Sequence, residues 1–136
     1  MSSKQLELWQ LLLAKAAQDE YVVDQLMALP DSPDEVIGFH LQQAAEKLLK
    51  AALSRLRVAY RRTHNLRELM VLLADSGRPP PSDLDPLHEL TPYATDWRYD
   101  LLPIEGEEAL ERAVARGLVA RLRGWVEGLE TDESSR

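Results

Sequence analysis

The side chains of this chain best suited to chemistry are two histidines and the polar residues near them. His40 precedes Gln43 and Lys47 by three and seven residues, so a helix would place the three side chains on one face. His64 follows in a polar segment. An imidazole exchanges protons near neutral pH, and Lys and Arg side chains hold phosphate. These residues are therefore candidates for acid–base chemistry or for binding a phosphate-bearing ligand, although a lone His among apolar residues is more often a packing residue.

Cations gather in one part of an acidic chain. The formal net charge of −7 argues against general attraction to nucleic acid. Residues 47–67, however, carry seven basic side chains and no acidic one, so the remaining residues sum to −7 − 7 = −14. The basic residues are Lys47, Lys50, Arg55, Arg57, Arg61, Arg62 and Arg67. Their spacing describes an ordinary solvated helix face as well as a phosphate site, and the lack of acids is what favours the phosphate site.

Other chemistries are disfavoured by residue type and spacing. The chain has no cysteine, which excludes disulfides, thiolate nucleophiles and cysteine-ligated zinc. Its histidines lack the HxH or HxxxH spacing of a metal site, so we expect no metal and no cofactor. Gly77 is followed by prolines and no glycine-rich phosphate loop is present. Any chemistry must rest on oxygen and nitrogen groups.

Helices are expected to position these residues. Apolar side chains recur at helical spacing through most of the chain. A first helix is predicted over residues 4–28 with Asp19 on its polar side, and a second from Ser32, as its N-cap, to just before Tyr60. A third begins at Asn65, capped with Glu68; a fourth begins at Ser82 or Asp83 and is interrupted near Pro92; a closing helix includes Leu110, Val114, Leu118, Leu122, Trp125 and Leu129.

These elements predict an all-α fold, an up-and-down antiparallel bundle of four to five helices. A chain of 136 residues fits a single core, so we expect one domain over residues 1–130 and a frayed tail over residues 131–136. No apolar run approaches the ~20 residues that cross a bilayer, and the first residues are too polar for a signal peptide. We therefore expect no membrane association and a cytoplasmic location.

One string is far more specific than these patterns. Residues 39–51 read FHLQQAAEKLLKA and closely resemble the signature helix of HEPN domains, roughly FHxQQAAEKxLKA. Thr63-His64-Asn65-Leu66 resembles the THxL joint of that family, and Arg98-Tyr99 is similar to its Arg-Tyr near the end of the fourth helix. One departure is visible, because Asp100 follows where the family often has proline and Pro103 comes later. The resemblance spans most of the chain.

The resemblance implies a helical bundle of the nucleotidyltransferase substrate-binding-subunit type that frequently forms homodimers. It also implies binding of a nucleotide or RNA, or pairing with a minimal nucleotidyltransferase in a toxin–antitoxin-like module. On this basis the candidate ligand-binding residues are His40, Gln43, Lys47, Lys50, His64, Arg98 and Tyr99.

Some branches of the family are metal-independent ribonucleases that use an Arg followed, after four to six residues, by a His. No histidine follows Arg98 in this chain, so that motif is incomplete. Arg57 and His64 match the spacing formally, but they lie at the joint between the second and third helices. We therefore expect a binding protein rather than an enzyme. The alternatives are a ribonuclease toxin that combines Arg98 with His64, and a non-catalytic dimeric interaction scaffold.

Overall fold

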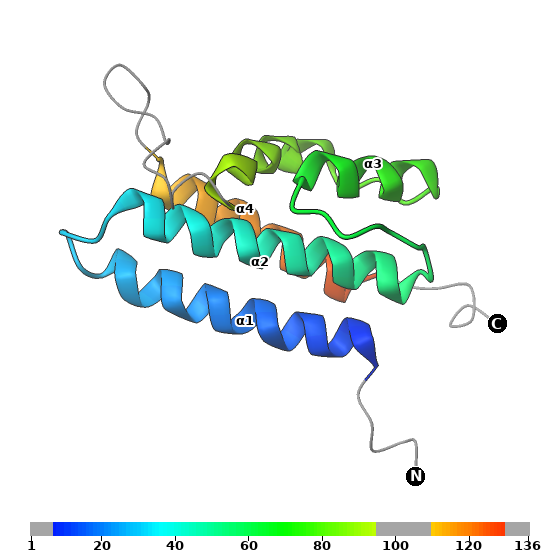
Figure 1. Ribbon diagram of the computed structural model, residues 1–136, viewed down its shortest axis with the longest axis horizontal. Coiled ribbons are helices and arrows are strands. Elements are labelled where there is room, and N and C mark those ends of the chain that lie inside the picture. Colours follow the sequence, from blue (N-terminus) through cyan, green and yellow to red (C-terminus); the bar gives the residue numbers. More distant parts are fainter. Residues whose placement is uncertain (1–6, 95–109, 130–136) are drawn as a thin grey trace, which may run out of the picture.

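The regular elements are all helical in the computed structural model, which describes residues 7–94 and 110–129 (Figure 1). The predicted all-α bundle is confirmed. In chain order the elements are α1 (Leu8–Met27), α2 (Asp34–Arg55), α3 (Leu66–Asp75), the 3-10 helix η2 (Ser82–Ala94) and α4 (Arg112–Glu127). None of the described helices is both long and apolar enough to cross a membrane.

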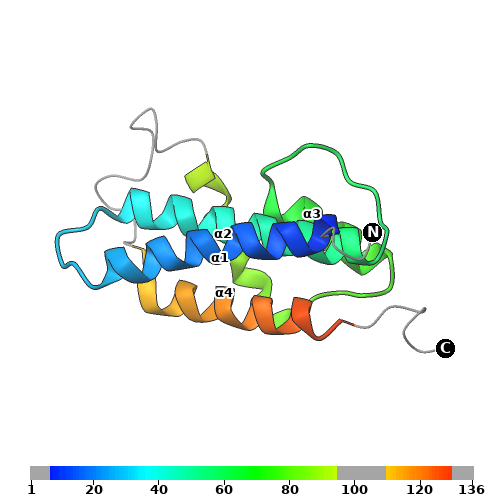
Figure 2. The same ribbon diagram turned by 90° about the horizontal axis from the view of Figure 1, so that it is seen from below.

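Helix α2 is the centre of the bundle. Helices α1 and α2 form an antiparallel hairpin, α3 and η2 lie along the other flank of α2, and α4 lies behind it (Figures 1 and 2). One side of α2 is correspondingly apolar and fully buried, including Ile37, Leu41, Leu48 and Leu49. Burying each such side chain contributes about 1.5–3 kcal/mol. The core therefore fixes α2 and, with it, the polar side chains on the opposite side of that helix.

The start of α2 differs in detail from the prediction. Pro33 occupies the N-cap position and no side chain caps the helix, so the expected Ser32 cap is wrong. The Ser32 hydroxyl instead donates to the Leu26 carbonyl at 2.6 Å and closes the turn from α1. Asp34 and Glu35 stabilise the first turn through the helix dipole.

Helix α2 ends at Arg55, several residues before the predicted end. Arg57 takes the left-handed conformation, with φ of 63°. The Arg57 and Val58 amides donate to the carbonyls of Ser54 and Leu53, at 3.1 and 2.9 Å, which is the Schellman pattern of a helix C-terminus. The same pattern ends α3, where Gly77 has φ of 91°. Because Arg57, and not glycine, takes the left-handed position after α2, the sequence gives no glycine signal for the end of that helix.

These two caps should respond in opposite ways to substitution. Gly77→Ala is expected to lower the free energy of unfolding by about 1 kcal/mol, because alanine is strained at positive φ. Arg57→Gly is expected to raise it by up to about 1 kcal/mol, because that strain is relieved. Urea unfolding followed by circular dichroism measures both changes. Effects of the same sign in the two variants would contradict this account of the caps.

The segment predicted as an interrupted fourth α-helix is a 3-10 helix, η2, which includes Pro86 and Pro92. Its buried leucines, Leu84, Leu87 and Leu90, recur every three residues. Side chains three apart eclipse in a 3-10 helix, so this spacing gives one straight apolar ridge. The prolines also lack the amide donors that an α-helix would use. The period of three was the sequence signal for this element.

The apolar stripe of α4 is rotated slightly from the predicted one. Leu118 and Leu122 are buried as expected, whereas Val114 is exposed and Ala115 takes its place facing the core.

In α3, the predicted Asn65 cap is confirmed, since its side chain accepts from the Glu68 amide at 3.1 Å. The Glu68 carboxylate binds Arg61 and Thr63, however, and so does not close a capping box.

Candidate functional site

The candidate site is the polar side of α2, which we call the polar face. It consists of His40, Gln42, Gln43, Glu46, Lys47 and Lys50. These residues recur at spacings of three and four, so their side chains form a continuous band along the helix. Two carboxylates, Asp19 from α1 and Glu46 from α2 itself, organise the band.

Asp19 holds one end of the polar face. Its two carboxylate oxygens lie 2.9 Å from His40 Nδ1 and 2.6 Å from Lys47 Nζ. The Asp19 side chain, predicted on the polar side of α1, is only 11% exposed because that side faces α2 at this residue. A carboxylate can be buried there because a cation and a ring N–H compensate its lost hydration. Packing of α1 against α2 therefore brings His40 and Lys47 to one shared anion.

Glu46 organises the second cluster. Its carboxylate lies 2.9 Å from His64 Nδ1 and 2.8 Å from Lys50 Nζ, and it accepts from Gln42 Nε2 at 3.0 Å. Burial by itself raises the pKa of this carboxyl, but the hydrogen bonds from Lys50, His64 and Gln42 together outweigh burial. The pKa of Glu46 consequently lies below its ordinary value, and the group is a buried carboxylate at neutral pH.

Two glutamines join these clusters. Lys47 Nζ donates to Gln43 Oε1 at 3.3 Å, and Gln43 Nε2 donates to Gln42 Oε1 at 2.8 Å. Gln42 is fully buried, and its Nε2 atom donates to the Glu46 carboxylate and to the His64 carbonyl, each at 3.0 Å. A chain of donors thus runs from Lys47 through Gln43 and Gln42 to Glu46. The polar face is one connected network in which Asp19 and Glu46 are the two anions.

This arrangement defines the chemistry open to the histidines. An ionised carboxylate only accepts hydrogen bonds, so the Nδ1 atoms of His40 and His64 must be the donors. In the neutral ring, Nε2 then becomes the acceptor, and protonation turns it into a second donor. The side chain of His64 is 56% exposed and that of His40 is 26% exposed. His64 is the better placed of the two to meet a ligand or to transfer a proton.

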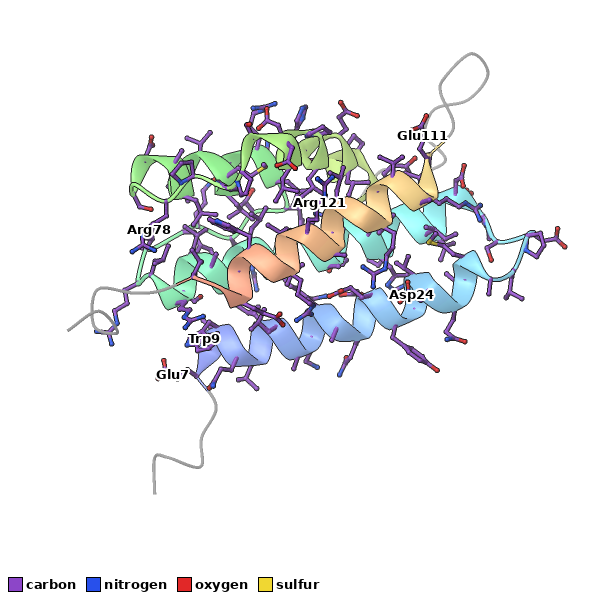
Figure 3. The ribbon with its side chains drawn as sticks, turned by 180° about the vertical axis from the view of Figure 1, so that it is seen from behind. Glu7, Trp9, Asp24, Arg78, Glu111 and Arg121 are labelled. Carbon is purple, nitrogen blue, oxygen red and sulfur yellow. The ribbon has the colours of Figure 1, made fainter. Side chains whose placement is uncertain are left out.

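A second ionic cluster links α1 to α4. Glu20 lies 2.6 Å from Arg123 Nη2 and 3.5 Å from Arg116 Nη1, and Arg116 Nε lies 2.7 Å from Asp24 Oδ1. Figure 3 shows Asp24 on α1 at the side that faces α4. The hydrogen bond from Arg116 lowers the pKa of Asp24 and raises the pKa of Arg116. These charges are mutually compensated, so we assign the cluster to the packing of α1 and α4.

The structure brings together five of the seven predicted ligand-binding residues. His40 and Lys47 meet at Asp19, His64 and Lys50 meet at Glu46, and Gln43 lies in the connection between them. The other two, Arg98 and Tyr99, lie outside the described residues. In the described ranges, no group of three or more His, Asp or Glu side chains could hold a metal ion.

The sequence predictions did not assign the two anions to the site. Asp19 lies three residues after Ala16 and four before Val23, both fully buried, so its place in the apolar stripe of α1 was the available signal. Glu46 stands in the signature string between Ala45 and Lys47, without any sign in its spacing that it is buried. From periodicity alone, an acidic residue is predicted to be exposed. Whether it is buried depends on contacts with other segments of the folded chain.

Comparison with known proteins identifies the family. The family model described as HEPN domain matches residues 27–129, which is 103 of the chain's 136 residues. No curated protein and no solved structure gave a significant match. The match includes α2, its polar face, the α2–α3 connection and α4. The chain belongs to the HEPN domain family.

Proposed function

We propose that this protein binds the phosphate groups of a nucleotide or of RNA through the polar face of α2 and His64. Family membership supports a nucleotide- or RNA-related role in broad terms. The observation that carries the proposal is the pair of histidines whose Nδ1 atoms are held by the buried carboxylates Asp19 and Glu46. Each ring keeps Nε2 for a ligand, because the protonated ring donates a hydrogen bond from Nε2 to a phosphate oxygen. A ring that is oriented in advance loses little entropy on binding.

The candidate residues would contribute differently. His64 is the most exposed of them and would make the first contact with phosphate. Lys47 and Lys50 already neutralise Asp19 and Glu46, so their net attraction for a further anion is reduced. Gln43 and His40 lie beside them on the same helix face. By resemblance to the family, Arg98 and Tyr99 would complete the site.

The test is binding of ATP and of a fluorescein-labelled RNA 12-mer to the purified protein at moderate salt. His64→Ala is expected to weaken binding about tenfold, since a hydrogen bond to a charged group contributes about 1.5–3 kcal/mol. His40→Ala should weaken it less. His88→Ala, in η2, is the matched control and should bind like the parent protein. Unchanged affinity in both site variants would refute the assignment of this site.

A second candidate function is metal-independent RNA cleavage, and the Glu46–His64 contact favours it. A carboxylate-oriented imidazole can take the proton of a ribose 2′-hydroxyl as its oxygen attacks phosphorus. The bond to the 5′-oxygen then breaks, this oxygen takes a proton from water, and the other product is a 2′,3′-cyclic phosphate. Arg98 would supply the cation near the phosphate. Incubating the same labelled RNA in the presence of a chelator distinguishes the functions, because an intact 12-mer rejects the ribonuclease.

We further propose that the protein acts in the cytoplasm as a homodimer, with a minimal nucleotidyltransferase as partner in a toxin–antitoxin-like module. The family resemblance supports this assignment. If the chain is instead a non-catalytic interaction scaffold, the same assays will show neither binding nor cleavage.

A further inference from the structure

Five of the seven cations of residues 47–67 fall into two groups. Lys47 and Lys50 are partly buried and bound to Asp19 and Glu46, and the guanidinium of Arg55 is stacked 4.5 Å above the Trp9 ring. Arg62 and Arg67 are exposed, and among the described residues neither forms an ion pair with an acid. The uncompensated positive charge therefore lies around the connection between α2 and α3, which we call the link (residues 56–65).

The link presents its cations from a fixed backbone. Gln42 Nε2 donates to the His64 carbonyl, Thr63 Oγ1 donates to Glu68, and the Leu66 amide donates to Thr91 Oγ1. Figure 1 shows the link running from the end of α2 back along that helix to the start of α3. This path explains how His64 reaches Gln42 and Glu46 in the middle of α2.

The one buried residue of the link is flanked by exposed ones. Thr63 is buried, whereas Arg62 and His64 on either side of it are exposed. Arg62 and His64 thus both reach solvent on the outer side of the link. Arg61 also lies there with its side chain 72% exposed, although it binds Glu68 through two nitrogens. Arg67 follows in the first turn of α3.

Arg67 lies at the N-terminus of α3, which is an unfavourable place for a cation. A cation in the first turn of a helix opposes the helix dipole and costs about 0.3–1 kcal/mol. The partial positive charge of the α3 N-terminus adds to those of Arg62 and Arg67. Positive groups that follow one another along an exposed segment fit a ligand with several phosphates. The planar guanidinium group of an arginine can also bind two phosphate oxygens at once.

We propose that Arg62 and Arg67, together with His64, bind the phosphate backbone of single-stranded RNA along the link. This inference rests on the proposed function. It assigns the electrostatic part of RNA binding to Arg62 and Arg67 in place of the α2 lysines Lys47 and Lys50. A polymer is favoured over a mononucleotide because Arg62 and Arg67 are five residues apart, on the link and on α3, and neighbouring phosphates of one strand can meet them separately.

The experiment measures binding of the labelled RNA 12-mer as a function of salt for Arg62→Glu/Arg67→Glu. We expect affinity to fall at least about tenfold and the salt slope to decrease by about 1.4, because each phosphate contact on a single strand contributes about 0.7. Arg62→Lys/Arg67→Lys should retain most of the affinity. Lys15→Glu/Arg121→Glu changes the net charge equally at exposed positions on α1 and α4. It breaks only the exposed Arg121–Asp83 ion pair and should bind like the parent protein.

The outcomes separate this inference from the proposed function. If RNA binds and the Arg62→Glu/Arg67→Glu variant binds with unchanged affinity and slope, the link assignment is wrong while the proposed function stands. Equal losses in the Lys15→Glu/Arg121→Glu control would show that only net charge matters and would also overturn it. Binding of ATP without RNA binding overturns the choice of a polymer. If the parent protein binds neither ligand, the proposed function fails as well.

Discussion

Replacing Glu46 by Gln should lower the free energy of unfolding by about 2–4 kcal/mol at pH 7, because removing one member of a buried ion pair leaves the other uncompensated. The Glu46 side chain is 7% exposed, and its carboxylate is bound to Lys50, His64 and Gln42. The amide preserves the shape of the side chain but removes its charge. Lys50 is then left as a poorly hydrated cation, and the anion that orients His64 is lost.

The loss of unfolding free energy in Glu46→Gln should become smaller as the pH falls. In the folded protein the pKa of Glu46 lies below its ordinary value of 4.5. The ionised carboxylate therefore stabilises the fold at pH values above about 4.5, and this contribution disappears as the pH falls through the folded-state pKa. The difference between the parent protein and Glu46→Gln should be largest near neutral pH and shrink in acid.

Urea unfolding at a series of pH values between 7 and 3 measures this difference. Glu89→Gln is the matched control, because Glu89 is exposed and forms no ion pair with the other described residues. It should change stability by less than about 0.5 kcal/mol at every pH. A constant difference between the parent protein and Glu46→Gln across the series would show that the charge of Glu46 does not stabilise the fold.

A second large effect is expected at Gly38, a buried position in the first part of α2. A Cβ atom added there would lie 2.6 Å from Tyr93 Cγ and closer still to the ring atoms Cδ1 and Cε1. Gly38→Ala should therefore displace the Tyr93 ring and η2 from α2. Overpacking costs about 1–3 kcal/mol or more, which exceeds the roughly 1 kcal/mol that alanine gains in a helix. We expect a net loss of about 2 kcal/mol.

Two further variants test this explanation. Gly124 is an exposed helical glycine in α4 with no atom near its added Cβ, so Gly124→Ala should raise stability by up to about 1 kcal/mol. In a Tyr93→Ala background, Gly38→Ala should be neutral or stabilising, because the ring is gone. Thermal and urea unfolding of the double-mutant cycle give the coupling. If Gly38→Ala is equally damaging without the Tyr93 ring, the steric account is wrong.

The fold could be predicted from the sequence because several signals agree. Apolar spacing located the helices, and the string FHLQQAAEKLLKA pointed to the family that the HEPN domain match then confirmed. The errors lie at positions where backbone geometry overrides residue preference. Arg57 ends α2 in a conformation that usually selects glycine, and Pro33 stands at the N-cap where Ser32 was expected. In η2 the leucines recur every three residues, a 3-10 signal that was not used when the segment was predicted as an interrupted helix.

The site could be predicted only in part. Residue chemistry and resemblance selected His40, Gln43, Lys47, Lys50 and His64, which the structure places in one network. The anions that organise them were missed, because a single sequence does not show that Asp19 packs against α2 or that the link covers Glu46. The same long-range contacts neutralise Lys47 and Lys50, which as a sequence run had no acid beside them. Compensation of charge is a property of the folded chain.

The 3-10 geometry of η2 also determines how far a short segment can reach. A 3-10 helix rises about 2.0 Å per residue against 1.5 Å for an α-helix. The thirteen residues of η2 therefore span about 26 Å, where an α-helix of the same length would span about 20 Å. Helix α2 is 22 residues, or about 33 Å, long. Because of this larger rise, η2 reaches as far along the flank of α2, which it shares with α3, as an α-helix about four residues longer would reach.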